Sequence, residues 1–160
     1  MSGKEKTMAD TRQLCTFLID DMLFGVDVMN VQEVIRYQEM TSVPLASATV
    51  RGLINLRGQI VTAIDMRARL GIAPRDASEL PMNVVATTAD GVVSLLVDEI
   101  GDVLEVDERT FERAPETLSA IFRELVPGIF KLDGRLLLLL DAEKVAALGT
   151  SAGRPKLRAA

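Results

Sequence analysis

Residues 50–71 read VRGLINLRGQIVTAIDMRARLG, and this stretch decides what kind of fold to expect. Two runs rich in β-branched and aliphatic residues, 49–56 and 59–65, flank the dipeptide Arg57-Gly58. Such runs on either side of a glycine-containing pair predict two strands joined by a tight turn. Residues 66–70 predict one helical turn that ends at Gly71, because glycine readily adopts the left-handed conformation found after a helix.

The same pattern of short strands and tight turns continues on both sides of this stretch. Upstream, 14–19 and 23–28 read as two strands that turn at residues 20–22. Downstream, Asp90-Gly91 and Asp133-Gly134 each separate two apolar runs, and Asp-Gly is a strong two-residue hairpin signal. About ten short strands with frequent turns favour a sandwich or small barrels. A polar loop at 73–81 predicts a boundary between two β-rich halves.

Length and composition predict a small folded domain that needs no disulfide bonds. The chain has 160 residues, of which 48% are hydrophobic and only 4% aromatic, so its core must be built from aliphatic side chains. A domain of this length buries enough surface to need no disulfide or metal for stability. We expect a folded region over 11–149 between flexible tails at 1–10 and 150–160, with short helices at 116–122 and 142–148.

The net charge and the missing residue types exclude several classes of function. The net charge is −5, whereas nucleic-acid binding favours a basic surface, so no nucleic-acid partner is expected. With no histidine and one cysteine, Cys15, the chain has no Ser-His-Asp triad, no Cys-His pair and no thiolate zinc site. The glycines of 52–58 lack the Lys-Ser/Thr of a phosphate-binding loop. The sequence therefore predicts no enzyme activity, no cofactor, no metal and no small-molecule substrate.

Two further features predict a cytoplasmic protein that does not insert directly into a membrane. Residues 1–13 are polar and lack the apolar segment of a secretory signal. The longest aliphatic run, 136–140, is far shorter than the roughly 20 residues that a membrane-spanning helix needs. A lone cysteine also fits a reducing compartment.

A second class of protein is kept as an alternative, the response-regulator receiver domain. Asp20 and Asp21 end one predicted strand, Asp65 ends another, and Lys131 lies late in the chain. In a receiver, such carboxylates hold Mg²⁺ and the lysine binds the phosphoryl group, which Asp65 would accept here. However, a strand rather than a helix is predicted directly after Asp21, and the Asp-Gly hairpins join antiparallel strands. Both features favour a solvated turn at Asp20-Asp21 over a metal site.

Four motifs, in order along the chain, resemble those of CheW-type chemotaxis coupling proteins. The most distinctive is 50–71, with its Asn-Leu-Arg-Gly turn and the Asp-hydrophobic-Arg that follows the second strand. Upstream, FGVDVMNVQEVI at 24–35 is similar to the family's second strand and the turn after it. Downstream, VVSLLVDEIGDVLEV at 92–106 and VPGIF at 126–130 are similar to its paired strands and closing segment. The resemblance covers residues 12–148.

The resemblance implies an all-β fold of two packed, five-stranded small barrels with a few short helices, and it implies no catalysis. Proteins of this family bridge the cytoplasmic tips of methyl-accepting chemoreceptors to the regulatory domain of a CheA-type histidine kinase. We therefore expect a cytoplasmic adaptor that is recruited to membrane-associated receptor arrays. An apolar groove would meet the receptor tip, and a separate patch would meet the kinase.

The resemblance also implies a set of partner-contact residues. Three of them are Arg57, Glu33 and Gly52. Arg57 would present its guanidinium to a partner carboxylate, or else form a local salt bridge that holds its turn. Glu33 would pair with an arginine of the kinase, or else be an ordinary solvated carboxylate. Gly52 would allow a close backbone approach or an unusual φ angle, so that a larger side chain would disturb the adjoining surface.

Four valines complete the set of expected contact residues. Val28 and Val31 flank the end of the second predicted strand, where matching apolar residues contact partners in the family; a core role is equally open. Val84 and Val85 match an apolar pair linked to receptor binding. Because adjacent residues of a strand face opposite sides, at most one of these two is expected at the surface.

Overall fold

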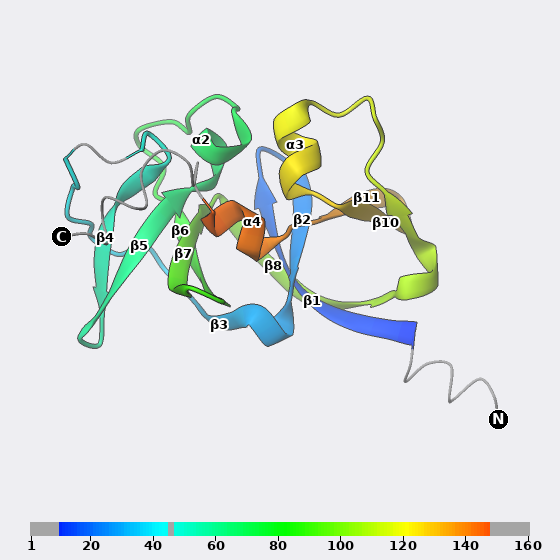
Figure 1. Ribbon diagram of the computed structural model, residues 1–160, viewed down its shortest axis with the longest axis horizontal. Coiled ribbons are helices and arrows are strands. Elements are labelled where there is room, and N and C mark those ends of the chain that lie inside the picture. Colours follow the sequence, from blue (N-terminus) through cyan, green and yellow to red (C-terminus); the bar gives the residue numbers. More distant parts are fainter. Residues whose placement is uncertain (1–9, 45–46, 148–160) are drawn as a thin grey trace.

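The computed structural model describes residues 10–44 and 47–147, and within them the chain forms two curled β-sheets with a few short helices (Figure 1). This architecture confirms the predicted mostly-β fold class. The predicted tails, apart from Asp10, lie outside the described residues.

Lobe 1 is built on a six-stranded sheet with the order β8-β1-β2-β11-β10-β9. Neighbouring strands are antiparallel, except that β11 runs parallel to β2. The 3-10 turn η2 (Glu108–Thr110) joins β8 to β9. The strands are β1 (Thr11–Ile19), β2 (Met22–Asp27), β8 (Glu99–Asp107), β9 (Phe111–Arg113), β10 (Gly128–Leu132) and β11 (Arg135–Leu139).

Lobe 2 is built on a five-stranded sheet with the order β3-β6-β7-β5-β4. Its neighbouring strands are antiparallel, except that β5 and β7 are parallel. The strands are β3 (Val31–Ile35), β4 (Val50–Leu56), β5 (Gln59–Asp65), β6 (Met82–Thr88) and β7 (Gly91–Val97).

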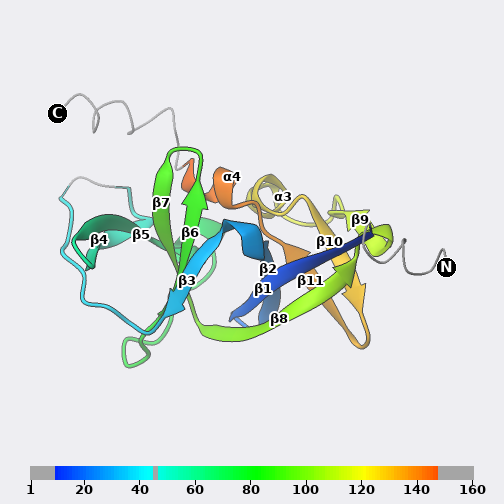
Figure 2. The same cartoon turned by 90° about the horizontal axis from the view of Figure 1, so that it is seen from below.

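Lobe 2 is inserted into lobe 1 rather than following it. The chain crosses from β2 to β3 through the 3-10 turn η1 (Val28–Asn30), and it returns from β7 to β8 through the single residue Asp98 (Figure 2). The boundary predicted at 73–81 is therefore wrong, because that polar loop connects two elements within lobe 2. Crossovers of three residues and one residue are too short to change the local composition.

The prediction of five strands in each sheet is correct for lobe 2 and wrong for lobe 1. The additional strand, β9, has three residues that are all exposed, so it carries no apolar alternation. In lobe 2 the two edges come together, because Thr41, after β3, pairs with Leu53 of β4 through two backbone hydrogen bonds of 2.8 and 2.9 Å. Beyond this bridge, closure of the two sheets into barrels stays a prediction.

Within the described residues, three apolar clusters form the core, and the largest lies between the lobes. One cluster belongs to lobe 1 and includes Leu14 and Phe130; another belongs to lobe 2 and includes Ile54 and Val85. The third cluster joins residues of both sheets and of the helices. Its fully buried members include Phe17 and Phe24 from lobe 1 and Ile64, Val84 and Leu95 from lobe 2.

Three short α-helices cover the junction between the lobes (Figure 1). Helix α2 (Met66–Leu70) begins after Asp65, whose carboxylate accepts the Arg67 N–H, and ends at Gly71 with φ 74°, as predicted. Helix α3 (Ala120–Leu125) lies later than the predicted 116–122, because Ser119 provides its N-cap. Helix α4 (Ala142–Ala146) follows β11. Among the described helices, none has the length and apolar character to cross a membrane.

Candidate functional site

The Asn-Leu-Arg-Gly sequence forms the predicted tight turn between β4 and β5. Both central residues have positive φ angles, 52° at Arg57 and 89° at Gly58, which is the conformation of a two-residue turn of type I′. The Asn55 side chain stabilises the turn, since its Oδ1 accepts the Gly58 N–H at 2.8 Å. Leu56 is buried beside the turn, whereas the Arg57 side chain remains 71% exposed.

Arg57 and Glu33 form a bidentate ion pair. Arg57 Nη1 and Nη2 donate to Glu33 Oε2 and Oε1, each at 2.6 Å. The hydrogen bonds from Arg57 hold the pKa of the Glu33 carboxyl below its usual value. This confirms the local salt bridge that the sequence left open for Arg57, and it means that Glu33 is not an isolated carboxylate. Contact of either residue with a partner stays a prediction.

The ion pair also explains how the two edges of lobe 2 are held together. Glu33 lies on β3 and Arg57 follows β4, and these strands are the first and last of the sheet. A flat five-stranded sheet would separate its edge strands by about 19 Å, because neighbouring strands lie about 4.8 Å apart. The sheet must therefore curl for the side chains to meet. Together with the bridge between Thr41 and Leu53, the pair fixes the β4–β5 turn next to β3.

Gly52 lies directly behind this bridge, and its close backbone approach is confirmed. A Cβ at this position would come within 2.6 Å of the Thr41 carbonyl oxygen, which is shorter than an ordinary contact. The alternative reason, an unusual φ angle, does not apply, since Gly52 is not among the described glycines with positive φ. Any larger residue must therefore displace the segment that closes the sheet.

Val28 and Val31 lie at the crossover between the lobes, and both are half-buried. Val28 begins η1, and Val31 begins β3 and packs against the cluster between the lobes. Between them the side chain of Met29 is 84% exposed. Val31 is therefore partly in the core, and contact of its accessible part with a partner stays a prediction.

Val84 and Val85 are both completely buried, so neither lies at the surface as a contact residue. Their side chains point in opposite directions, as expected, but both directions lead into core. Val84 belongs to the cluster between the lobes, and Val85 belongs to the cluster of lobe 2. Val85 is the cross-strand neighbour of Glu33 between β3 and β6.

Met29 and Ile60, two of the exposed apolar residues, could not be recognised as exposed from the sequence. Ile60 is 60% exposed and lies just after the Arg57 turn, opposite Asn55. The continuous apolar run that contains Ile60 gave no alternation from which its outward direction could be read. We call the exposed side chains of Arg57 and Ile60, together with the partly exposed Glu33, the site surface.

Three of the four residues of the receiver alternative, Asp20, Asp65 and Lys131, are each paired with other groups. Lys131 lies on β10 of lobe 1, where it pairs with Glu112 at 2.9 Å, whereas Asp65 lies at the end of β5 in lobe 2. Asp65 caps α2 and also lies near the arginines 51 and 75. Within the described ranges no three acidic, histidine or cysteine side chains are arranged to hold a metal ion. The receiver alternative is therefore wrong.

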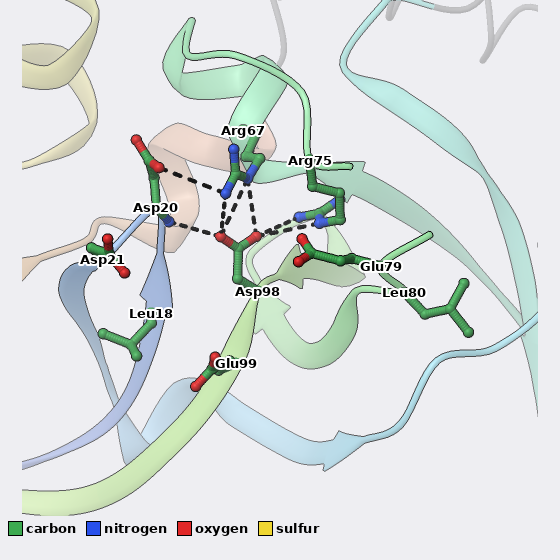
Figure 3. A pocket seen from close by; sticks show the side chains of 9 residues that line it. All are labelled: Leu18, Asp20, Asp21, Arg67, Arg75, Glu79, Leu80, Asp98 and Glu99. Atoms are coloured by element: carbon green, nitrogen blue, oxygen red, sulfur yellow. Dashed lines mark hydrogen bonds and ion pairs between the residues drawn. The ribbon is translucent and has the colours of Figure 1, made fainter. Parts of the chain in front are cut away.

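A second polar site lies where α2 meets the β1–β2 turn (Figure 3). Asp98 accepts hydrogen bonds from Arg67 and from Arg75 there, and Asp20 lies beside Arg67 at 3.7 Å. Burial alone would raise the pKa of Asp98, but hydrogen bonds from Arg67, the Asp20 N–H and Arg75 outweigh it and lower the pKa to about 2. These side chains line an open, polar groove of about 490 Å³.

The fold of two small β-lobes defines the class of protein, and comparisons with known proteins give its family. The model of the CheW-like domain matches residues 13–148, so the chain belongs to the CheW-like family. The crystal structure of the scaffolding protein TtCheW from Thermoanaerobacter tengcongensis superposes with a TM-score of 0.76 at 28% identity, over 84% of this chain and 91% of that one.

Curated relatives agree with the structural match. The probable chemotaxis protein CheW of Rhizobium etli is 36% identical over 132 residues, which cover 82% of this chain and 85% of the relative. The chemotaxis protein CheW of Thermotoga maritima is 34% identical over 143 residues, which cover 88% of this chain and 93% of the relative. The predicted resemblance is thereby confirmed, and the chain is an adaptor of chemotaxis signal transduction.

Proposed function

We propose that this chain is a non-enzymatic adaptor that couples the cytoplasmic tips of chemoreceptors to the regulatory domain of a CheA-type histidine kinase. Its place would be the cytoplasmic side of membrane-associated receptor arrays. The folded region that carries this role would span 11–149. The observation that carries the proposal is the site surface, where Arg57 is oriented by Glu33 while most of its side chain stays exposed.

The chemistry of the site surface suits a partner that offers a carboxylate beside apolar side chains. A guanidinium has five donor hydrogens, and the two bonds to Glu33 leave donors of Arg57 for a partner oxygen. Because Glu33 already fixes the side chain, little conformational entropy is lost when a partner binds. Ile60, beside the turn, adds exposed apolar area to the contact.

The remaining site residues would act by shaping this surface. Val28 and Val31 would contact the partner at the crossover, and Gly52 would keep the β4–β5 turn close to β3. Val84 and Val85 are buried, so they would influence this surface through core packing and not by direct contact. Each interface of this kind is small, so we expect individually weak binding that repeated copies in an array strengthen.

Calorimetric titration with the isolated regulatory domain of the cognate CheA-type kinase tests the proposal. Arg57→Glu should weaken binding strongly. The variant places a second carboxylate beside Glu33 and removes the cation that would bind the partner's carboxylate. Arg135→Glu is the matched control, since Arg135 is an exposed arginine of lobe 1, and it should leave the affinity unchanged. Absence of binding by the unmodified chain would contradict the proposal. Equal affinity for the unmodified and Arg57→Glu chains would remove Arg57 from the kinase surface.

A further inference from the structure

Asp98 is the only residue between β7 of lobe 2 and β8 of lobe 1. At this crossover its carboxylate binds groups from three segments (Figure 3). Arg67 of α2 donates through Nε and Nη2, the latter at 2.7 Å, and Arg75 donates through Nε and Nη2 at 3.3 and 2.9 Å. From lobe 1, the Asp20 N–H donates at 2.8 Å.

The charges of this junction are largely removed from solvent. The side chains of Arg67, Arg75 and Asp98 are 13%, 5% and 19% exposed. Arg75 Nη1 is buried without a hydrogen bond and lies 3.7 Å from Asp65 Oδ1. Two guanidinium groups therefore depend on Asp98 for most of their hydrogen bonds, and each bond has a defined direction.

The side chains of the cluster between the lobes make no such directional contacts, and beside it Arg69 of α2 donates only to the backbone carbonyls of Val145 and Lys144 in α4. The buried members of the cluster are aliphatic and aromatic side chains from both sheets. Apolar burial holds two surfaces together, but it is non-directional and depends mainly on the area removed from water. Buried ion pairs add little net stability, and their best-attested use is to select one arrangement among several of similar apolar packing.

We propose that the Asp98 junction sets the angle between the two lobes, with Asp98 as the positioning residue for Arg67, Arg75 and the β1–β2 turn. The apolar cluster would hold the lobes in contact, and the junction would select one orientation. The only other crossover of the described chain is η1, so a change of angle at Asp98 would turn the site surface relative to lobe 1. The inference concerns the free protein and does not depend on the partners proposed above.

Distance measurements by pulsed electron paramagnetic resonance on the full chain test this inference. Spin labels at Thr87→Cys in lobe 2 and Asp133→Cys in lobe 1, both exposed positions, would be read in a Cys15→Ala background. The unmodified junction should give one narrow distance distribution. Asp98→Asn should broaden it and shift its mean, because the amide places an N–H against a guanidinium. Glu112→Gln, which removes a charge from an ion pair within lobe 1, should change nothing.

A milder variant covers the case in which Asp98→Asn fails to fold. Asp20→Asn keeps a residue that tolerates the left-handed backbone at φ 52° and weakens only the contact with Arg67. It should broaden the distribution less than Asp98→Asn does. If Asp98→Asn folds, an unchanged distance distribution would overturn the proposal. If Asp98→Asn does not fold, an unchanged distribution in Asp20→Asn would overturn it.

Discussion

Two of the groups of paired arginine and carboxylate side chains in the described residues differ sharply in exposure. At the site surface, Glu33 pairs with an arginine that is 71% exposed. At the junction, Asp98 lies between two arginines that are 13% and 5% exposed. Exposed pairs are screened by water and contribute little to stability, whereas removing one partner of a buried pair strands the other charge. An ion pair between arginine and carboxylate can therefore orient a side chain for binding where it is exposed, or fix the fold where it is buried.

The largest effect on stability is expected when the junction loses its carboxylate. Asp98→Ala should lower the free energy of unfolding by about 2–4 kcal/mol, because two largely buried guanidinium groups lose their acceptor. Urea denaturation followed by circular dichroism measures this change. Glu112→Ala, at an exposed pair of lobe 1, is the control and should stay close to the unmodified chain. Equal losses for the two variants would remove the distinction between buried and exposed pairs.

The next largest effect is expected at the bridge behind the site surface. Gly52→Val should cost about 1–3 kcal/mol, because the new side chain collides with the Thr41 backbone and the segment after β3 must move. The same variant should weaken partner binding through displacement of β3. The control is Gly58→Asn, where nothing lies within 4 Å and asparagine tolerates the positive φ angle. A Gly52→Val chain with unchanged stability and binding would contradict the proposed role of the bridge.

The pH dependence of stability reports on the charge of the Asp98 carboxylate. The folded-state pKa of Asp98 is about 2, below its ordinary value of 3.8, so its contribution is complete above pH 3.8 and is lost as the pH falls through 2. The difference in unfolding free energy between the unmodified chain and Asp98→Asn should therefore shrink between pH 4 and pH 2. A difference that stays constant over this range would show that the carboxylate charge is not what stabilises the junction.

The smallest effect on stability and a clear effect on binding are expected at Arg57. Arg57→Lys should leave the unfolding midpoint nearly unchanged, because the pair is exposed, but an ammonium group cannot reproduce the planar bidentate geometry. Titration with the kinase regulatory domain should therefore show weaker binding than for the unmodified chain. Full affinity of Arg57→Lys would mean that only the charge matters at this position.

Local signals predicted the parts of the fold that are formed within a few residues. The Arg57-Gly58, Asp90-Gly91 and Asp133-Gly134 turns have glycine at a positive φ angle in each case, so the sequence marks them directly. The end of helix α2 was predicted for a similar reason, because Gly71 provides its C-cap, whereas the N-cap at Asp65 was not predicted. These features depend on backbone conformation, which neighbouring residues largely decide.

Features that depend on contacts between distant residues could not be predicted in the same way. The crossover at Asp98 lies within an apparently ordinary strand sequence, and its partners come from segments 31 and 78 residues away. The pairing of Glu33 with Arg57 requires the curl of lobe 2, which no local pattern reports. The burial of both Val84 and Val85 follows from core on both faces of β6, whereas strand alternation alone cannot distinguish one buried face from two.

The central claim is that this adaptor holds a receptor and a kinase at the same time. Sedimentation velocity of the chain mixed with a receptor cytoplasmic fragment and the kinase regulatory domain tests it most directly. We expect a ternary species that sediments faster than either binary complex, and Arg57→Glu should abolish it while Arg135→Glu should not. Two binary complexes that exclude each other, with no ternary species at saturating concentrations, would contradict the claim.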